Sequence, residues 1–350
     1  MSADAKLTNQ NYSLFDYGGM INAKNAVRTE AFTTALKNCI TPETVVLDIG
    51  TGTGYFALVA AQLGARHVYA IEPNPAIQVG REAAVDNGLA DRITFIQGMS
   101  NNVDLPEKVD VIISDIGGAL PLCGPLIRSL ADARERFLKP GGIMLPERDS
   151  LCAALVRAPG IYASYVAPWD DNSAGLDFHR ARQRVTSLVR KQPFQKKNLT
   201  SSLQEWASVD YGQLNSPHYD SELTWSPTKA GPVHGLALWF DRIFPGGQQF
   251  SNAPDEIGNP IYGNLYLPWS EPVDLAEDDT VTVKLRASFV DGNYIWSWQT
   301  TVRTAQDVEK ARFSQSSFLS QFKARGQPGN ATLSDEQPSQ LPSDELAAVA

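Results

Sequence analysis

The sequence predicts an α/β domain with a parallel sheet, followed by a mostly antiparallel β domain. Up to about residue 147, short apolar runs alternate with helical segments, which is typical of βαβ units. Beyond that point, strand-like runs recur with little helical periodicity between them. The chain has 350 residues and 43% apolar content, which is enough for one large domain or two ordinary ones.

The α/β part is expected to contain five strands and three intervening helices. Each predicted helix stops at a glycine or at the Pro-Gly-Gly of residues 140–142, because these residues end helices. The predicted strands are 44–50, 67–72, 92–98, 108–115 and 143–147. The predicted helices are 55–64, 75–88 and 125–142.

The second part carries five strand-like runs: "SLCAALVRA", "VHGLALWFDRIF", "GNLYLPWSEPV", "DTVTVKLRASFV" and "NYIWSWQTTV". A helix is predicted after them, over Ala305 to Phe322, as a C-terminal helical region of residues 305–325. Residues 326–350 are polar, acidic and rich in proline, and we expect a disordered tail there.

Composition excludes several classes of protein. The formal net charge is −9 without a long basic tract, so we expect no nucleic-acid partner. The chain has no apolar run long enough to span a membrane and no apolar start typical of a signal peptide, so we expect no membrane association. Three widely spaced cysteines favour a reducing compartment and a cytoplasmic location. The histidines show no metal-ligand spacing, so no metal site is expected.

A glycine-rich turn follows the first predicted strand. Gly50, Gly52 and Gly54 allow the backbone to approach a ligand closely. Glu72 ends the second strand, where a carboxylate can accept the hydroxyl hydrogens of a ribose. Asp48 disfavours a phosphate beside the turn, and the Gly-x-Gly-x-Gly spacing differs from a pyrophosphate-binding turn. S-adenosylmethionine fits, because it carries a sulfonium, an amino-acid end and a ribose without a phosphate. An ordinary tight βα turn is the alternative.

The loop "QGMSNN" follows the third predicted strand. We expect Met99 to lie against an adenine ring there, with Asn101 or Ser100 near the adenine amine. The alternative is an ordinary polar loop.

Segments from both parts of the chain resemble the protein arginine methyltransferase family, over roughly residues 10 to 303. In the α/β part these are "NYSLFDYGGM" with "KNAVRTEAF", "VVLDIGTGTG" with "ARHVYAIEPN", and "EKVDVIISD" before a loop with glycines. In the β part they are "PWDDNSAGLDF", "HGLALWFDRIF", "FSNAP" and "LYLPWSEPV". The β-part segments distinguish this family from other methyltransferases with a Gly-x-Gly-x-Gly turn.

The resemblance implies a class I S-adenosylmethionine-dependent methyltransferase with a seven-stranded Rossmann-like domain and a β-barrel. It implies an N-terminal helical lid at 1–40, the cofactor domain at 41–147 and the barrel at 148–304. Residues 170–205 would contain a dimerisation arm that docks on the partner's cofactor domain, so we expect a homodimer. The seven basic residues of the segment Arg180–Lys197 belong to this arm, with an acidic-peptide site or a solvated surface as alternatives.

The resemblance also assigns the cofactor-binding residues. Arg28 would bind the methionine carboxylate. The other assigned residues are Asp48, Gly50 and Gly52 for methionine and ribose, Glu72 for the ribose, and Met99 and Asn101 for adenine. A solvated helix arginine is the alternative for Arg28. Tyr12, Phe15 and Tyr17 would close over the cofactor or pack in the N-terminal core.

The acceptor loop departs from the family pattern of two glutamates. Asp115 replaces the first, and Gly124 stands at the position of the second. Two carboxylates normally hold a guanidinium through paired hydrogen bonds. The family's Thr-His-Trp loop aligns with Pro260, Ile261 and Tyr262, so its histidine is absent, whereas Asp255 or Glu256 could supply a carboxylate. The candidate catalytic residues are Asp115, Tyr262 and His234, the last with a structural alternative as a barrel histidine.

Three functions follow from this departure. The first is methyl transfer to an N or O nucleophile of a small molecule or modified peptide, since Gly117, Gly118 and Ala119 would widen the pocket. The second is a protein arginine methyltransferase in which Asp115 and another acid hold the guanidinium. The third is a non-catalytic, cofactor-binding scaffold, which an intact cofactor turn argues against. A dehydrogenase is disfavoured by the turn spacing.

Overall fold

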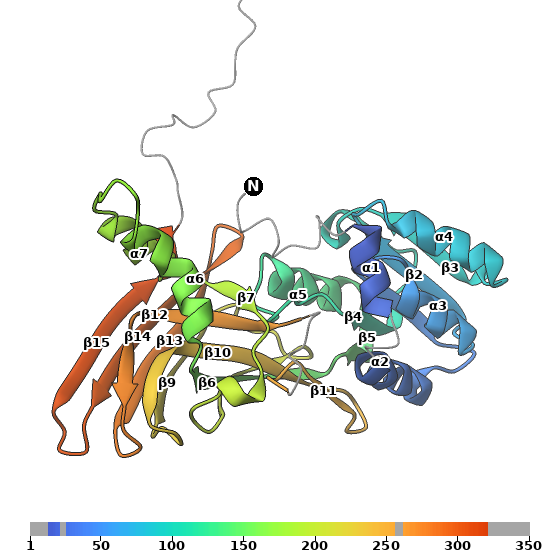
Figure 1. Ribbon diagram of the computed structural model, residues 1–350. Coiled ribbons are helices and arrows are strands. Elements are labelled where there is room, and N and C mark those ends of the chain that lie inside the picture. The colour runs from blue at the N-terminus through green and yellow to red at the C-terminus, as the bar shows by residue number, and fades with distance from the viewer. Residues whose placement is uncertain (1–12, 22–25, 256–261, 321–350) are drawn as a thin grey trace, which may run out of the picture. The chain divides into compact units, whose positions relative to one another are not determined.

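The computed structural model of the chain describes residues 13–21, 26–255 and 262–320 (Figure 1). The α/β part consists of α1 (Leu14–Ile21), α2 (Ala26–Cys39), β1 (Val45–Ile49), α3 (Tyr55–Gln62), β2 (His67–Glu72), α4 (Ile77–Asp86), β3 (Ile93–Gln97), β4 (Val109–Ser114), α5 (Leu126–Phe137) and β5 (Leu138–Leu145). All eight elements predicted in this part are present. The third helix ends at Phe137, before Pro140, and the chain enters β5 at once because proline cannot continue a helix.

The parallel sheet has the strand order β3-β2-β1-β4-β5. The chain builds outward from β1 to β2 and β3, then returns to place β4 on the other side of β1. This reversal opens a crevice outside the carboxyl ends of β1 and β4, which is where open α/β sheets bind ligands. The sheet has five strands, so the number seven implied by the resemblance is wrong for this part of the chain. The next strand, β6 (Arg148–Val156), instead pairs with two antiparallel strands of the second part.

The second part contains β7 (Arg190–Gln192), β8 (Gln204–Asp210), β9 (Tyr219–Trp225), β10 (Gly231–Ile243), β11 (Gln249–Ser251), β12 (Asn264–Leu275), β13 (Thr280–Val290), β14 (Asn293–Arg303) and β15 (Glu309–Ser316). One sheet has the order β7-β12-β10-β6-β8 with β11 beside β10, and the other has the order β15-β14-β13-β9. The sheets adjoin at both edges, because β8 contacts β9 and β12 contacts β15. Buried tryptophans belong to the hydrophobic core here, namely Trp225, Trp269 and Trp298. The predicted antiparallel domain is therefore confirmed.

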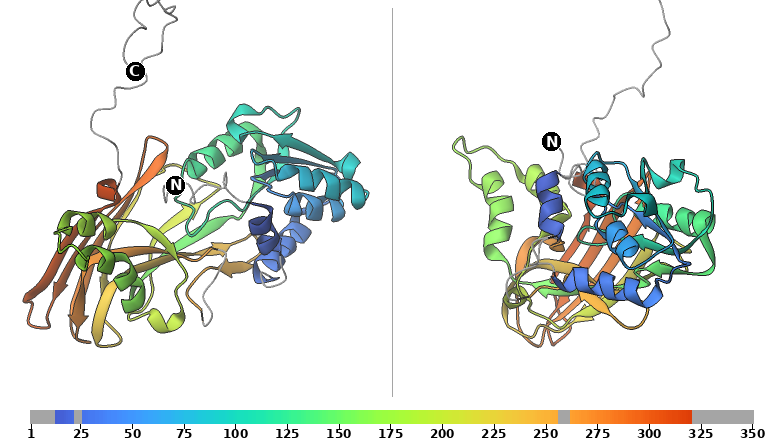
Figure 2. Two further views of the ribbon diagram at one scale, coloured as in Figure 1. Left: turned by 45° about the horizontal axis from the view of Figure 1, so that its top comes forward. Right: turned by 90° about the vertical axis from the view of Figure 1, so that its right-hand side faces the viewer.

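Two helices connect β6 to β7. They are α6 (Pro159–Asp170) and α7 (His179–Val185), which contact each other and form a helical hairpin (Figure 2). The rings of Trp169 and Phe178 lie 6.0 Å apart between centroids, although both side chains are partly exposed. The hairpin begins earlier than the arm expected near 170–205. Residues after α7 return to the sheet as β7 and β8, because their backbone groups pair with β12 and β6.

The predicted C-terminal helix is wrong over the residues that the structure describes. Residues Glu309–Ser316 form β15, which pairs with β14, and a short 3₁₀ turn follows at Ser317–Ser320. Phe313 and Gln315 are buried while Arg312 and Ser314 are exposed, which is the two-residue period of a strand. Within the described residues, no helix is long and apolar enough to cross a membrane. Residues 321–350, where a tail was predicted, lie outside the described residues.

Candidate active site

A pocket lies at the carboxyl ends of the central parallel strands. Gly50 follows β1, Glu72 ends β2, and Asp115 follows β4. These three positions are far apart in the sequence and meet because parallel strands end at the same edge of the sheet. Helices α1 and α2 contribute further lining residues, which include Tyr17, Met20 and Arg28. Two of the predicted catalytic residues, Asp115 and Tyr262, are thus brought together with five of the predicted cofactor residues, namely Arg28, Asp48, Gly50, Gly52 and Glu72.

The glycine turn after β1 has a conformation that requires glycine. Gly50 and Gly52 have φ angles of 71° and 57°, in the left-handed region that other residues rarely adopt. A Cβ at Gly52 would lie 2.6 Å from Cε1 of Tyr17, so the ring of Tyr17 packs directly on the turn. Of the three N-terminal aromatic residues in the predicted lid, Tyr17 is therefore at the pocket. Tyr12 and the side chain of Phe15 lie outside the described residues.

Glu72 is 1% exposed and accepts hydrogen bonds from two backbone groups. The N–H of Gly52 donates to Oε2 at 3.0 Å, and the N–H of Asn74 donates to Oε1 at 2.8 Å. Burial raises the pKa of Glu72, and these two hydrogen bonds oppose that rise. Each oxygen keeps acceptor capacity, because a carboxylate oxygen has more than one lone pair. The arrangement fits the predicted contact with a ribose diol.

Asp48 lies beneath the turn and is 3% exposed. Its Oδ2 accepts a hydrogen bond of 2.6 Å from the hydroxyl of Thr51. Burial raises the pKa of Asp48 to about 7, against the opposing effect of the Thr51 hydrogen bond. A buried carboxylate with one short hydrogen bond can be stabilised by a bound cation, which matches the predicted contact with the amino-acid end of S-adenosylmethionine.

A second, more apolar compartment adjoins the first on the other side of Glu72. Met99, Ser100 and Gly124 line it, together with Ile71, Ile116 and Leu130. Asn101 does not line either compartment and is exposed, and its Oδ1 accepts a hydrogen bond of 3.1 Å from the hydroxyl of Ser129. The structure thus brings Met99 and Ser100 to this compartment, whereas the Asn101 side chain bonds to Ser129, which is itself a lining residue. Gly124 lies at this compartment and not among the residues around Asp115.

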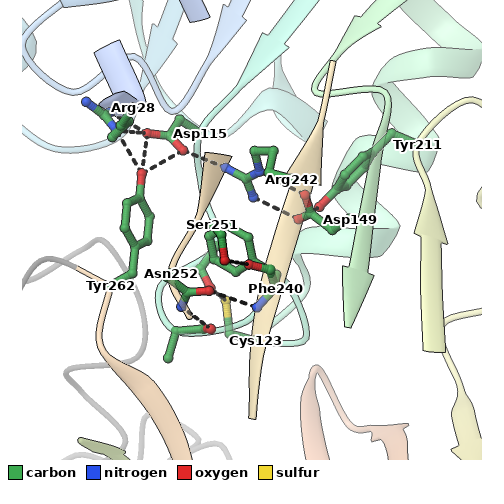
Figure 3. A network of polar contacts seen from close by, with 12 residues as sticks. Arg28, Asp115, Cys123, Asp149, Tyr211, Phe240, Arg242, Ser251, Asn252 and Tyr262 are labelled. Atoms are coloured by element: carbon green, nitrogen blue, oxygen red, sulfur yellow. Dashed lines mark hydrogen bonds and ion pairs between the residues drawn. The ribbon is translucent and has the colours of Figure 1, made fainter. Parts of the chain in front are cut away.

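Arg28, Asp115 and Tyr262 form a compact polar cluster (Figure 3). Nε of Arg28 donates to Oδ2 of Asp115 at 2.6 Å and to the hydroxyl oxygen of Tyr262 at 2.7 Å. Nη2 of Arg28 also forms an ion pair with Oδ2 of Asp115. The Tyr262 hydroxyl lies 2.9 Å from Oδ1 and 2.8 Å from Oδ2 of Asp115, so it can donate to either oxygen. Both charged side chains are 9% exposed, so the ion pair is largely shielded from water.

The charges in this cluster stabilise one another. Burial disfavours the charge of Arg28, but the carboxylate of Asp115 outweighs it and raises the pKa of Arg28 above its ordinary value. Burial and Asp115 raise the pKa of Tyr262 above its ordinary value, so its hydroxyl stays protonated at neutral pH. The predicted Arg28 side chain is therefore a pocket residue, not a solvated helix arginine.

The β part supplies three further residues that sequence reasoning missed, namely Arg242, Asp149 and Tyr211. Nη1 of Arg242 donates to Oδ1 of Asp115 at 2.7 Å, and the other end of Arg242 binds Asp149. Tyr211 donates to Asp149 at 2.7 Å. Asp115 is thus contacted from both parts of the chain.

The structure does not bring His234 to the pocket. Its Nδ1 accepts a hydrogen bond of 3.4 Å from the N–H of Ala158, and its ring packs edge-on against Tyr162. Burial and the nearby Arg157 lower the pKa of His234, which fits the structural alternative of a barrel histidine. Asp255 is exposed and its backbone oxygen accepts from Lys196, away from the pocket lining.

Of the three small residues that were expected to widen the pocket, two line it and one does not. Gly117 and Gly118 line the pocket, but Ala119 is buried beside Asn252, whose side chain donates to its carbonyl at 3.0 Å. Glu256, Pro260 and Ile261 lie outside the described residues.

Comparisons with known proteins agree with this geometry. Residues 28–146 match the family model described as ribosomal protein L11 methyltransferase (PrmA). A "probable protein arginine N-methyltransferase 6" of Arabidopsis thaliana is 30% identical over 64% of this chain and 53% of its own length. A "protein arginine N-methyltransferase 1" of Chlamydomonas reinhardtii is 29% identical over 75% of this chain and 78% of its own length. A "probable histone-arginine methyltransferase 1.3" of Arabidopsis thaliana is 32% identical over 58% of this chain and 40% of its own length. This chain thus spans about half the length of the two Arabidopsis relatives.

Solved structures agree as well. Arabidopsis thaliana protein arginine methyltransferase 10 matches with a TM-score of 0.73 and 22% identity, over 83% of this chain and 94% of that structure. The Trypanosoma brucei PRMT1 enzyme–prozyme complex with AdoHcy matches with a TM-score of 0.74 and 23% identity, over 85% of this chain and 96% of that chain. The chain has the class I methyltransferase fold and resembles the protein arginine methyltransferases.

The predicted fold class and family resemblance are therefore confirmed, and the relatives agree with the predicted enzyme class and cofactor. In this methyltransferase-like chain, the pocket fits S-adenosylmethionine on structural grounds. It combines a glycine turn with no room for side chains, a buried carboxylate at β2, a buried arginine and an adjoining apolar compartment. The described residues contain no cluster of three or more metal-ligating side chains.

Proposed function

We propose that this chain is an S-adenosylmethionine-dependent methyltransferase that methylates the guanidinium of an arginine in a protein or peptide. One observation carries the choice of acceptor: Asp115 and Tyr262 bind a guanidinium in the structure, that of Arg28. The names of the relatives, which are protein arginine methyltransferases, support the same choice. They give no support to a small-molecule acceptor, which the widened acceptor loop suggested.

Arg28 has two competing partners in this proposal. It would bind the carboxylate of the cofactor's methionine end, and it binds Asp115 in the structure. A bound cofactor carboxylate would draw Arg28 away from Asp115. Oδ2 of Asp115 and the oxygen of Tyr262 would then be free to accept hydrogen bonds from an acceptor guanidinium, which resembles Arg28 in shape and charge.

S-adenosylmethionine supplies a methyl group activated by the sulfonium. Asp115 would accept an N–H from the acceptor and hold its other nitrogen toward that methyl group. Tyr262 would accept a second N–H, as it accepts one from Arg28. A C–N bond would form as the S–C bond breaks and S-adenosylhomocysteine leaves, and the acceptor nitrogen would release one proton to Asp115 and from there to water. Tyr17 and the buried walls of the pocket would keep water out.

Cofactor binding is tested by isothermal titration with S-adenosylhomocysteine. We expect saturable binding with one site per chain. An absence of binding at millimolar ligand would contradict the proposal at its first step.

The acceptor is tested by incubating the protein with methyl-labelled S-adenosylmethionine and an extract of the producing cell, then separating macromolecules from small molecules. We expect label in the protein fraction. Label confined to small molecules would favour the first interpretation of the sequence and refute an arginine acceptor. Cofactor binding without any transfer would favour the non-catalytic scaffold.

We also propose a homodimer, in which the hairpin α6–α7 docks on the cofactor domain of the partner. The resemblance is the basis for this proposal, and the exposed hydrophobic side chains Trp169, Leu176 and Phe178 at the hairpin support it. Sedimentation analysis should give twice the mass of the chain, and deletion of residues 172–178 should yield monomers. The cytoplasmic location stays a prediction.

A further inference from the structure

Arg242 connects the antiparallel part of the chain to the acceptor loop. It lies at the end of β10 and is 1% exposed. Nη1 donates to Oδ1 of Asp115 at 2.7 Å, while Nε and Nη2 donate to Oδ1 and Oδ2 of Asp149 at 2.9 and 2.8 Å (Figure 3). One guanidinium therefore bridges two carboxylates.

The Asp149 end of this bridge is rigidly held. Asp149 is fully buried in β6, directly opposite Arg242 in the register of β6 and β10. Its Oδ2 also accepts the hydroxyl of Tyr211 at 2.7 Å. The guanidinium carbon of Arg242 lies 4.6 Å from the ring centroid of Phe240, and this contact helps to fix the plane of the guanidinium group. Paired hydrogen bonds on a planar guanidinium leave it little freedom to rotate.

The Asp115 end of the bridge is not needed to neutralise Arg242. Asp149 already balances the charge of Arg242, so Arg242 does not need Asp115 as a counter-ion. A Cβ at Gly117 would lie 3.4 Å from Nη2 of Arg242, so the acceptor loop lies against the guanidinium at ordinary contact distance. Arg242 therefore donates to Oδ1 of Asp115, whereas Oδ2 accepts from Arg28.

We infer that Arg242 is a positioning and specificity-determining residue, which holds Asp115 so that Oδ2 alone is presented to the acceptor. The inference deepens the proposed function and rests on it. It also states how the missing second glutamate changes acceptor binding. The acceptor is bound by a single carboxylate oxygen together with Tyr262, in place of two carboxylates.

Three groups bond to Asp115, and a fourth charged group lies near it. Arg28 comes from α2, Arg242 from β10 and the Tyr262 hydroxyl from two residues before β12, and each bonds to Asp115. The fourth, Asp48 on β1, is a like charge, because its own pKa is raised in part by Asp115. When Arg28 leaves for the cofactor, Arg242 is the cation that remains on Asp115.

The first test is Arg242→Lys. A lysine carries a compact ammonium group in place of a planar guanidinium, so it can contact Asp149 or Asp115 but not both in this geometry. We expect kcat/KM for an arginine-containing peptide to fall about tenfold or more, with the Kd for S-adenosylhomocysteine within about twofold of the unmodified chain. We also expect the loss to appear mainly as a rise in KM for the peptide, because Asp115 is no longer held in the orientation that binds the acceptor. Arg312→Lys, an exposed arginine on β15 that pairs with Glu309, is the matched control.

A second variant separates positioning from structural support. Arg242→Met with Asp149→Leu and Tyr211→Phe replaces Arg242 and its partners in the β part by apolar side chains and leaves Asp115 paired with Arg28, so no buried charge is left unpaired. We expect this variant to fold and bind S-adenosylhomocysteine but to show the same loss in kcat/KM. Recovery of the activity of the unmodified chain would overturn the inference, since Arg242 would then serve only to neutralise Asp149. An unchanged KM for the peptide in Arg242→Lys would overturn it too.

A binding readout distinguishes this inference from the proposed function. An arginine-containing peptide is titrated into the protein with saturating S-adenosylhomocysteine. If the unmodified chain binds the peptide without methylating it, the proposed function fails, yet a weaker peptide Kd in Arg242→Lys would still support the role of Arg242. Equal peptide affinity in both proteins refutes that role.

Discussion

Arg28 and Asp115, which are 87 residues apart in the sequence, form an ion pair at the centre of the pocket, with Nε of Arg28 2.6 Å from Oδ2 of Asp115. The pair joins the N-terminal helix α2 to the loop after β4. Both partners have a predicted functional role, one toward the cofactor and the other toward the acceptor. Under the proposed function, this ion pair would have to open before Arg28 binds the cofactor and Asp115 binds the acceptor.

Replacing Arg28 by methionine should weaken S-adenosylhomocysteine binding by about 10- to 100-fold, since a hydrogen bond to a charged group contributes about 1.5–3 kcal/mol. Binding of 5′-methylthioadenosine, which lacks the amino-acid carboxylate, should change by less than about threefold. Isothermal titration of both ligands measures the difference. Arg66→Met is a matched control, because Arg66 forms an exposed ion pair with Glu107. An equal loss for both ligands would refute the contact between Arg28 and the carboxylate.

Replacing Glu72 by glutamine should reduce S-adenosylhomocysteine affinity by about tenfold or more, because an amide cannot accept from two ribose hydroxyls and two backbone N–H groups as a carboxylate can. Calorimetric Kd values measure the effect. Glu107→Gln serves as the control, since Glu107 lies outside the pocket lining. Unchanged affinity in Glu72→Gln would show that this carboxylate does not bind the ribose.

Gly52→Ala should destabilise the protein more than Gly88→Ala. Both glycines have positive φ angles, 57° and 67°, so both substitutions carry a backbone cost of about 1 kcal/mol. A Cβ at Gly88 meets open space, whereas one at Gly52 lies 2.6 Å from the ring of Tyr17. The free energy of unfolding in urea should therefore fall by an additional 1 kcal/mol or so in Gly52→Ala. Equal losses would mean that Tyr17 does not pack on the turn.

Asp48→Asn should stabilise the cofactor-free protein at neutral pH but not at acid pH. Burial raises the pKa of Asp48 to about 7 in the folded state, whereas the unfolded value is about 3.9. The folded state therefore binds the proton more tightly, and the stability that this provides is complete below pH 4 and lost as pH rises to 7. Asp48→Asn does not lose stability in this way, because an asparagine side chain does not ionise.

Urea unfolding of both proteins from pH 4 to 8 measures this effect. The difference in the free energy of unfolding should grow by about 2 kcal/mol or more up to pH 7 and then level off. A difference in the free energy of unfolding that stays constant with pH would contradict the raised pKa of Asp48.

The parallel-sheet side of the site and Tyr262 could be predicted from the sequence, whereas Arg242 and its partners on the antiparallel side could not. Gly50, Glu72 and Asp115 follow buried parallel strands, whose ends meet at one edge of the sheet whatever the details. Arg242 sits in a strand where it pairs with Asp149, and this contact depends on the register of β10 against β6. A lone arginine after an apolar run usually signals the exposed end of a strand, so no signal marked it as buried.

The same reasoning explains the error at the C-terminus of the β part. The segment around Glu309 and Arg312 is rich in charges and helix-forming residues, which favoured a helix. Pairing with β14 overrides that propensity, because it satisfies the backbone and buries Phe313 in the core. The contact of Asn101 with Ser129 was also not predictable, since it depends on a short 3₁₀ turn at Ser100–Asn102.

The most direct test of the central claim is amino-acid analysis of protein labelled by this chain with methyl-labelled S-adenosylmethionine, beside an Asp115→Asn variant. We predict that the label is recovered as methylarginine and that the variant transfers at least about tenfold less while keeping its affinity for S-adenosylhomocysteine. Label on residues other than arginine, or equal transfer by Asp115→Asn, would contradict the account.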